Sequence, residues 1–215
     1  PDRGYSEVDG FDSESFPLAP IKSKVAVLNC YDSLWIYNQQ PHNKDLDYWR
    51  QFICFYTACR SLGLNVDIIN PSQLKAGEYS LVIAPALTLV DENTASKLTD
   101  YAKSGEIIFG PRTAFRSGSG LVHQDGQFDA IRDLVSARLG NFDSMRPTLH
   151  QTIVDENGQQ MEARLWAESF NPDDAEATHW YQHGPLDQQA AVIRKGNVSV
   201  IGALSEQLIS QQIRL

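Results

Sequence analysis

Short apolar runs alternate with amphipathic stretches through the first 140 residues, and this alternation limits the fold more than any other feature. The runs are continuously apolar, as in strands buried on both faces of a sheet. Between them, apolar residues recur at steps of three and four, as on one helix face. Strands are expected at 24–28, 65–69, 81–87 and 106–110, and helices within 42–63, 91–105 and 128–140. This order predicts a parallel sheet with helices on both faces.

The stretch 42–63 is the longest of the expected helices. Its spacing predicts an inward face made of Leu46, Trp49, Ile53, Tyr56 and Cys59. Asn43 or Asp45 is expected near the start of the helix, and Gly63 lies just past its end.

The last third of the chain changes character. Two pairs of strand-like runs flank Asn157-Gly158 and Gly196-Asn197, which are dipeptides typical of hairpin turns. A short helix is expected at the end of the chain, with Ser205 as its N-cap. The parallel α/β core is therefore expected to be completed by antiparallel hairpins.

The charge composition limits the kinds of partner that the chain is expected to bind. The chain has 27 acidic and 18 basic residues, a formal net charge of −9, which argues against nucleic acid and anionic membranes. No apolar run approaches the roughly 20 residues that a membrane-spanning helix needs. Residues 1–21 have acids, glycine and proline without a periodic apolar pattern, so we expect a linker there and one α/β domain at 22–215.

The cysteines give a weak indication of the compartment. Cys30, Cys54 and Cys59 are an odd number and form no CxxC pair, so a disulfide framework is not expected. The first residues are acidic and polar, unlike a secretory signal peptide. We therefore expect a reducing, cytoplasmic compartment.

The turn Gly110-Pro111-Arg112-Thr113 follows the expected strand 106–110, at the edge of a parallel sheet where ligands and nucleophiles commonly lie. Proline has no N–H for an oxyanion hole, and arginine does not deprotonate. The late strand 198–202 is followed by Ala203 without the histidine that a hydrolytic triad needs. We expect no catalytic residue in this turn, although Thr113 remains an alternative nucleophile.

Other candidates for chemistry are isolated. Cys30 follows the first strand, but its neighbour Asp32 has the wrong charge to activate a thiol. His179 and His183 are four residues apart, yet the surrounding residues favour a strand or loop over a metal-binding helix. The glycine-rich stretch 116–122 opens no helix that could bind phosphate. We therefore expect neither a metal nor a cofactor.

Aromatic and apolar side chains are expected in the loops at the sheet edge, where polar residues are more usual. Exposed aromatic residues at such an edge commonly anchor interfaces, but they can equally pack beneath the loop as local core. The candidate interface residues are Trp35, Tyr37, Pro41, His42, Arg112 and Phe115.

Four stretches together resemble a known family. "VAVLNCYDSLWIYNQQPHNKDLDYW", "LVIAPALTLVDE", "LTDYAKSGEIIFGPRTAF" and "FDAIRDLVSARLGNFD" are similar, in order and spacing, to the middle domain of family 42 glycoside hydrolases. These enzymes are mostly β-galactosidases, and the resemblance covers roughly residues 22–204. Ala114 stands where the family commonly has glycine, and Cys30 where an acidic or aromatic residue is commoner.

The resemblance implies a flavodoxin-like, class I glutamine amidotransferase-like three-layer sandwich that acts as a trimerisation domain. The catalytic glutamates of the family belong to a barrel of about 250 residues or more that precedes this domain. The expected function is therefore a non-catalytic oligomerisation domain, joined by its linker to a barrel in the same chain. The alternatives are a stand-alone amidotransferase-like hydrolase that uses Cys30 or Thr113, and a carbohydrate-binding module that uses the aromatic residues of the sheet edge.

Overall fold

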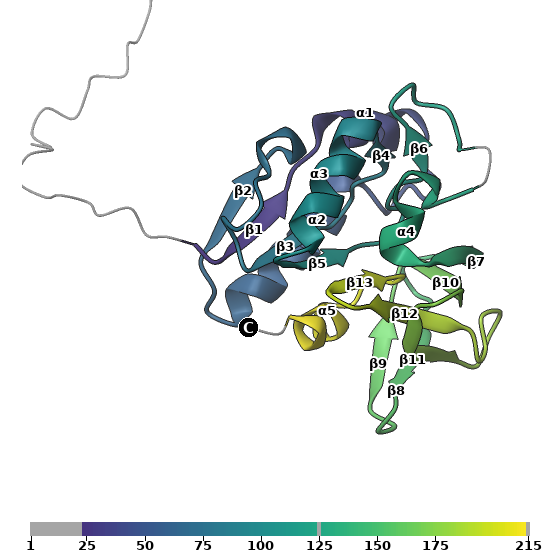
Figure 1. Ribbon diagram of the computed structural model, residues 1–215. Helices are drawn as coiled ribbons and strands as arrows, with labels where there is room; N and C mark the ends of the chain where they lie inside the picture. The colour runs from purple at the N-terminus through teal and green to yellow at the C-terminus, as the bar shows by residue number, and fades with distance from the viewer. Residues whose placement is uncertain (1–22, 124–125, 214–215) are drawn as a thin grey trace, which may run out of the picture.

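The computed structural model describes residues 23–123 and 126–213. Within these residues eleven strands form one sheet, with the order β2-β1-β3-β5-β13-β12-β11-β8-β9, and β10 pairs with both β12 and β7. The first five strands in this order are parallel, and the others are antiparallel (Figure 1). The strands are β1 (Val25–Leu28), β2 (Val66–Ile69), β3 (Leu81–Ala84), β5 (Glu106–Phe109), β7 (Ala137–Ser144), β8 (Gln151–Asp155), β9 (Gln160–Ala163), β10 (Trp166–Pro172), β11 (Glu176–Gln182), β12 (Ala190–Lys195) and β13 (Val198–Ile201).

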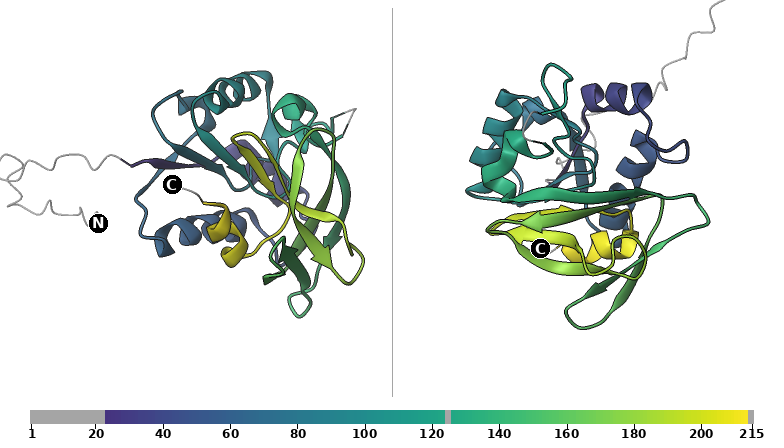
Figure 2. Two further views of the ribbon diagram at one scale, coloured as in Figure 1. Left: turned by 60° about the horizontal axis from the view of Figure 1, so that its bottom comes forward. Right: turned by 90° about the vertical axis from the view of Figure 1, so that its right-hand side faces the viewer.

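Helices cover both faces of the parallel part, which makes three layers. The longer helices α2 (Tyr48–Ser61) and α3 (Glu92–Ala102) lie on opposite sides of the sheet, and α5 (Glu206–Gln212) lies beside α2 (Figure 2). Alternate residues of each parallel strand point to the two sides, so Val25 and Val27 join one buried cluster and Ala26 and Leu28 the other. The remaining elements are α1 (Tyr31–Gln39), α4 (Arg132–Val135), the 3-10 turns Pro71–Gln73 and Asp129–Ile131, and the small strands β4 (Leu89–Val90) and β6 (Arg116–Ser117).

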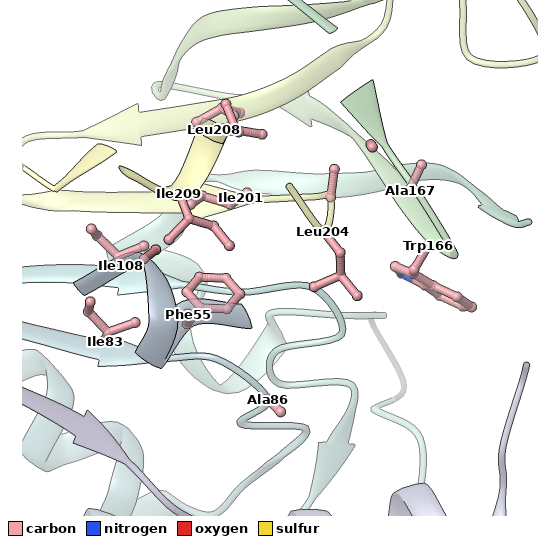
Figure 3. Close-up of a cluster of buried hydrophobic side chains, with 14 of the residues drawn as sticks. Phe55, Ile83, Ala86, Ile108, Trp166, Ala167, Ile201, Leu204, Leu208 and Ile209 are labelled. Atoms are coloured by element: carbon pink, nitrogen blue, oxygen red, sulfur yellow. The ribbon is translucent and has the colours of Figure 1, made fainter. Parts of the chain in front are cut away.

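The core on the α2 side is centred on Phe55. Figure 3 shows its ring among Ile83 of β3, Ile108 of β5 and Ile209 of α5. All four side chains are at most 2% exposed. Because burial of each stabilises the chain by about 1.5–3 kcal/mol, this contact fixes α2 and α5 against the sheet.

Strand β13 joins the two halves of the sheet. It pairs in parallel with β5, where Val198 is opposite Ile107, and antiparallel with β12, where Ile201 is opposite Val192. The expected hairpins are confirmed as β8–β9 and β12–β13. The end helix is confirmed as α5, whose N-cap is Ser205. The expected α/β architecture, with a parallel sheet and C-terminal antiparallel strands, is therefore confirmed.

Three local expectations were wrong. Residues 128–140 do not form one helix, because Ser136 takes a left-handed conformation with φ 51° that ends α4, and β7 begins at Ala137 and pairs with β10. Trp35 and Tyr37 were expected in a loop but lie in the helix α1. The strand expected at 81–87 ends at Ala84, since Pro85 cannot continue it.

The inward face of α2 agrees with the expectation only in part, because Leu46 and Cys59 are buried as expected. Trp49 and Ile53 are 44% and 51% exposed, whereas Tyr48, Phe52 and Phe55 of the same helix are buried. Both sets have helical spacing, so periodicity alone could not choose between them. The N-cap is Asp47 rather than Asn43 or Asp45, and its side chain accepts a hydrogen bond from the Arg50 N–H at 2.8 Å.

Candidate functional site at the sheet edge

The turns that follow β3 and β5 approach closely at the carboxyl edge of the sheet. A Cβ added at Gly110 would lie 2.1 Å from the Pro85 carbonyl oxygen, so only glycine allows this approach. The buried Gln51 side chain of α2 donates from Nε2 to the carbonyl oxygens of Pro85 and Pro111, the latter at 2.8 Å. Its Oε1 accepts from the Tyr37 hydroxyl at 2.7 Å. One side chain therefore joins both turns to α1 and α2.

Arg112, the residue of this turn singled out in the sequence, is buried and only 2% exposed. Its φ of 61° is in the left-handed region, which costs a non-glycine residue free energy. Its backbone N–H donates to both carboxylate oxygens of Glu168, at 3.0 and 3.1 Å. The guanidinium carbon lies 4.0 Å from the ring centre of Tyr37 and 5.5 Å from that of Trp166. The aromatic rings and the carboxylate together stabilise this buried cation.

Glu168 of β10 is the second charged member of the site and is 2% exposed. Besides the Arg112 N–H, its carboxylate accepts from Trp166 Nε1 at 3.0 Å and from Gln127 Nε2 at 3.3 Å. Burial raises the pKa of this carboxyl, and the hydrogen bonds from Arg112, Trp166 and Gln127 offset part of the rise. The Tyr181 hydroxyl donates to the Glu168 carbonyl oxygen at 2.8 Å. Glu168 therefore joins the parallel and antiparallel halves of the sheet.

His42 lies over this charged pair among three aromatic rings. Its ring centre is 6.0 Å from that of Phe115, 6.2 Å from that of Phe142 and 5.7 Å from that of Trp166. The pKa of His42 is lowered by the partial burial of its ring and by the positive charges of Arg112 and Arg116. The imidazole is therefore held in its neutral form over a wider pH range than a free histidine.

A small cavity of about 10 Å³ lies under these rings, lined among others by Arg112 and Gln127. Arg112 Nη2 and Gln127 Oε1 are buried and have no hydrogen-bond partner among the residues that the structure describes. The cavity has room for about one water molecule, which could accept from the guanidinium and donate to the amide oxygen.

The nucleophiles considered in the sequence are engaged in local structure. The Thr113 hydroxyl is fully buried and donates to the Gly110 carbonyl oxygen at 2.8 Å. Cys30 is 7% exposed and is the N-cap residue of α1, where its N–H donates to the Tyr48 hydroxyl at 2.8 Å. Both residues therefore pack as structural residues at the carboxyl edge of the sheet.

The two histidines considered as metal ligands lie in and after a strand. His179 belongs to β11, and its Nδ1 is 2.9 Å from the Thr178 hydroxyl. His183 follows β11 with a left-handed φ of 67°. Across residues 23–123 and 126–213, no three histidine, cysteine or acidic side chains are grouped as metal ligands would be. In the same residues no helix is both long and apolar enough to cross a bilayer.

The structure separates the six candidate interface residues into two kinds. Tyr37 and Arg112 are each 2% exposed and form the buried network, while Trp35 is 63% exposed. Pro41 and His42 are exposed, and Phe115 is half-buried beside His42. The six therefore share one edge of the sheet but not one surface.

Sequence reasoning missed four members of the network: Gln51, Gln127, Trp166 and Glu168. Glu168 is 56 residues from Arg112 in the chain, so no local spacing could connect them. The one available signal was a glutamate among apolar residues in "LWAESF". Such an apolar run is typical of a buried strand, so its glutamate would be buried as well.

The chain is similar to known proteins over most of its length. Residues 23–213 match the family described as the β-galactosidase trimerisation domain. The β-galactosidase Bga of Halorubrum lacusprofundi is 36% identical over 96% of this chain, and the β-galactosidase BgaH of Haloferax lucentense is 30% identical over 94%. The aligned regions are 32% and 31% of these relatives, so the chain spans about a third of their length.

Solved structures agree with this similarity. The β-galactosidase from the Antarctic haloarchaeon Halorubrum lacusprofundi superposes with a TM-score of 0.84 at 36% identity, over 89% of this chain and 29% of that one. The β-galactosidase from the psychrophilic Marinomonas ef1 superposes with a TM-score of 0.83 over 94% of this chain and 29% of that one. At 20% identity the second similarity shows the fold alone.

Proposed function

The chain belongs to the family of β-galactosidase trimerisation domains, and from this we propose that it is a non-catalytic domain that assembles three copies of a β-galactosidase-like glycoside hydrolase. The match of residues 23–213 to this family carries the proposal. The chain covers about a third of relatives named as β-galactosidases, so the catalytic domain is proposed to lie elsewhere in the same protein. Residues 1–21 would then be its linker.

The fold is proposed to be flavodoxin-like. The parallel strands have the order β2-β1-β3-β5-β13, which is 2-1-3-4-5 when only these strands are counted. This is the strand order of flavodoxin-like folds, in which ligands bind at the carboxyl edge of the sheet. Here that edge has the buried network of Arg112 and Glu168, so we propose that it serves assembly and structure and not a substrate. The cytoplasmic location remains a prediction.

The exposed candidate residues are proposed to lie at or beside the contact between copies. Trp35, Pro41 and His42 offer side chains to a partner, and Phe115 supports His42. The buried Tyr37 and Arg112 are proposed to hold this surface in place. Their contribution to assembly would then be indirect.

Sedimentation equilibrium of the chain, with a parallel assay on a chromogenic galactoside, tests this function. We expect an assembly of three times the 24.0 kDa chain mass, and no hydrolysis by the chain alone. A strict monomer up to millimolar concentration would contradict the assembly role. Hydrolysis that is lost in Cys30→Ser or Thr113→Ala would instead favour the hydrolase.

A further inference from the structure

Four large apolar side chains of α1 and α2 face solvent. Tyr31 and Trp35 of α1 are 59% and 63% exposed, and Trp49 and Ile53 of α2 are 44% and 51% exposed. Members of each pair are four residues apart, so they lie on one side of their helix. We call these four residues the outer helical face.

The two halves of this face lie side by side. The Tyr48 hydroxyl accepts from the Cys30 N–H at 2.8 Å, which places the start of α2 against the start of α1. The Trp49 ring packs edge-on against the Tyr48 ring at 5.3 Å. Leu34, between Tyr31 and Trp35 in the sequence, packs on the core that α2 covers. The four side chains therefore belong to one region of the surface.

The size of the face indicates an interface. Aromatic side chains bury 150–250 Å² each, so three half-exposed aromatic groups together with Ile53 present roughly 400 Å². Apolar patches of this size on a monomer are often functional. A standard interface buries about 800 Å² on each partner, with an apolar centre and a polar rim. The outer helical face supplies about half of that area, as such a centre would.

The charge around the face favours another copy of the chain as the partner. Residues 31–61 contain three acids and three bases, whereas the whole chain has a net charge of −9. Two copies of so acidic a protein repel each other over most of their surface. A neutral, apolar region is where that repulsion is least.

We infer that the outer helical face of one copy packs against a different surface of the next copy. This inference rests on the proposed trimerisation, because a closed ring of three needs two unlike surfaces on every copy. The sequence pattern agrees, since Trp49 and Ile53 have the spacing of a buried helix face although the monomer leaves them exposed. Contact with the next copy would bury them.

The double variant Trp35→Ser/Trp49→Ser tests the inference, with Leu121→Ser as its matched control. Leu121 is 68% exposed and lies in the stretch after β6. Sedimentation equilibrium gives the association constant, and far-ultraviolet circular dichroism with thermal melting verifies that each variant folds. Because aromatic anchors dominate interfaces, we expect association to weaken at least ~30-fold in the double variant and to be unchanged in Leu121→Ser.

A second variant, Ile53→Asp, tests the same face without changing a tryptophan, in case the double variant does not fold. It is also expected to dissociate the trimer. A wild-type chain that forms trimers, with both test variants assembling equally well, would overturn the inference and leave the proposed function standing. A wild-type chain that stays monomeric would overturn both. Equal weakening by Leu121→Ser would also overturn the inference, because the effect would not be specific to the face.

Discussion

Replacing Glu168 by alanine should destabilise the chain more than replacing any exposed acid. The carboxylate accepts hydrogen bonds from the Arg112 N–H, Trp166 Nε1 and Gln127 Nε2, and all of these contacts are buried. Each stranded buried donor costs about 1–3 kcal/mol, and the variant leaves three of them without their acceptor. We therefore expect Glu168→Ala to lower the free energy of unfolding by at least about 3 kcal/mol, against a total of about 5–15 kcal/mol for a typical protein.

Urea denaturation followed by tryptophan fluorescence, at one fixed protein concentration, measures this loss. Glu162→Ala is the matched control, because the Glu162 side chain is 55% exposed and pairs with Arg164 on the surface. Exposed ion pairs contribute about 0–1 kcal/mol, so this control should lose no more than that. A loss in Glu168→Ala no larger than in Glu162→Ala would refute the structural role of the carboxylate.

The pH dependence gives an independent measure of the same group. Burial raises the pKa of Glu168 above its ordinary value of 4.5, so the folded chain keeps this proton to higher pH than the unfolded chain. The contribution of Glu168 to stability is then greatest below pH 4.5 and falls as the pH rises through the raised folded value. Glu168→Gln should remove that fall, which urea denaturation between pH 4 and 8 would detect. Parallel pH profiles for wild type and variant would contradict the raised pKa.

Three further outcomes are expected. Gly110→Ala should lose at least about 1–3 kcal/mol in urea denaturation, because its Cβ would meet the Pro85 carbonyl oxygen; an unchanged midpoint would mean that the two turns separate easily. Asp47→Ala should cost about 0.5–2 kcal/mol by the same measurement, since it removes the N-cap of α2, and a stabilised variant would contradict this. Burial raises the pKa of Cys54 and Cys59 to about 11, so Ellman's reagent at pH 8 should modify both slowly in the native chain and rapidly in urea; equal rates would count against their burial.

The strands were predictable because burial on both faces leaves a continuous apolar signal. The stretches "KVAVL" and "EIIFG" needed no knowledge of their neighbours, and their observed strands β1 and β5 lie within one residue of the expected bounds. The hairpins were predictable from turn dipeptides that lie between strand-like runs. Apolar runs and turn residues, which are local sequence features, were thus sufficient to predict these strands and hairpins.

The phase of α2 and the end of α4 were not predictable in this way. Trp49 and Phe52 are equally apolar, and only the packing against β3 and β5 decides which of them turns inward. Residues 128–140 kept helical spacing past Val135, but Ser136 turns left-handed and the following residues pair with β10. In both segments, contacts with residues far away in the sequence determine the observed structure.

The buried network was the least predictable part of the molecule. The turn at Arg112 could be located from the sequence, and its lack of an activated nucleophile could be argued from residue types. Its partner Glu168 could not be found, because β10 reaches the turn only after the whole sheet is assembled. Such a charge pair is a property of the tertiary structure and has no sequence period.

The place of β13 in the sheet has a consequence for how the protein is made. Strand β13, which begins at Val198, completes a parallel sheet whose other members all lie before residue 110. A ribosome adds roughly 5–20 residues per second, so several seconds pass between the synthesis of β5 and that of β13. During this time the edge of β5 that pairs with β13 has no partner strand. The nascent chain must remain soluble during this interval with one sheet edge unpaired, a condition that favours aggregation. Premature termination before Val198 should therefore yield an aggregating product and not a smaller folded domain.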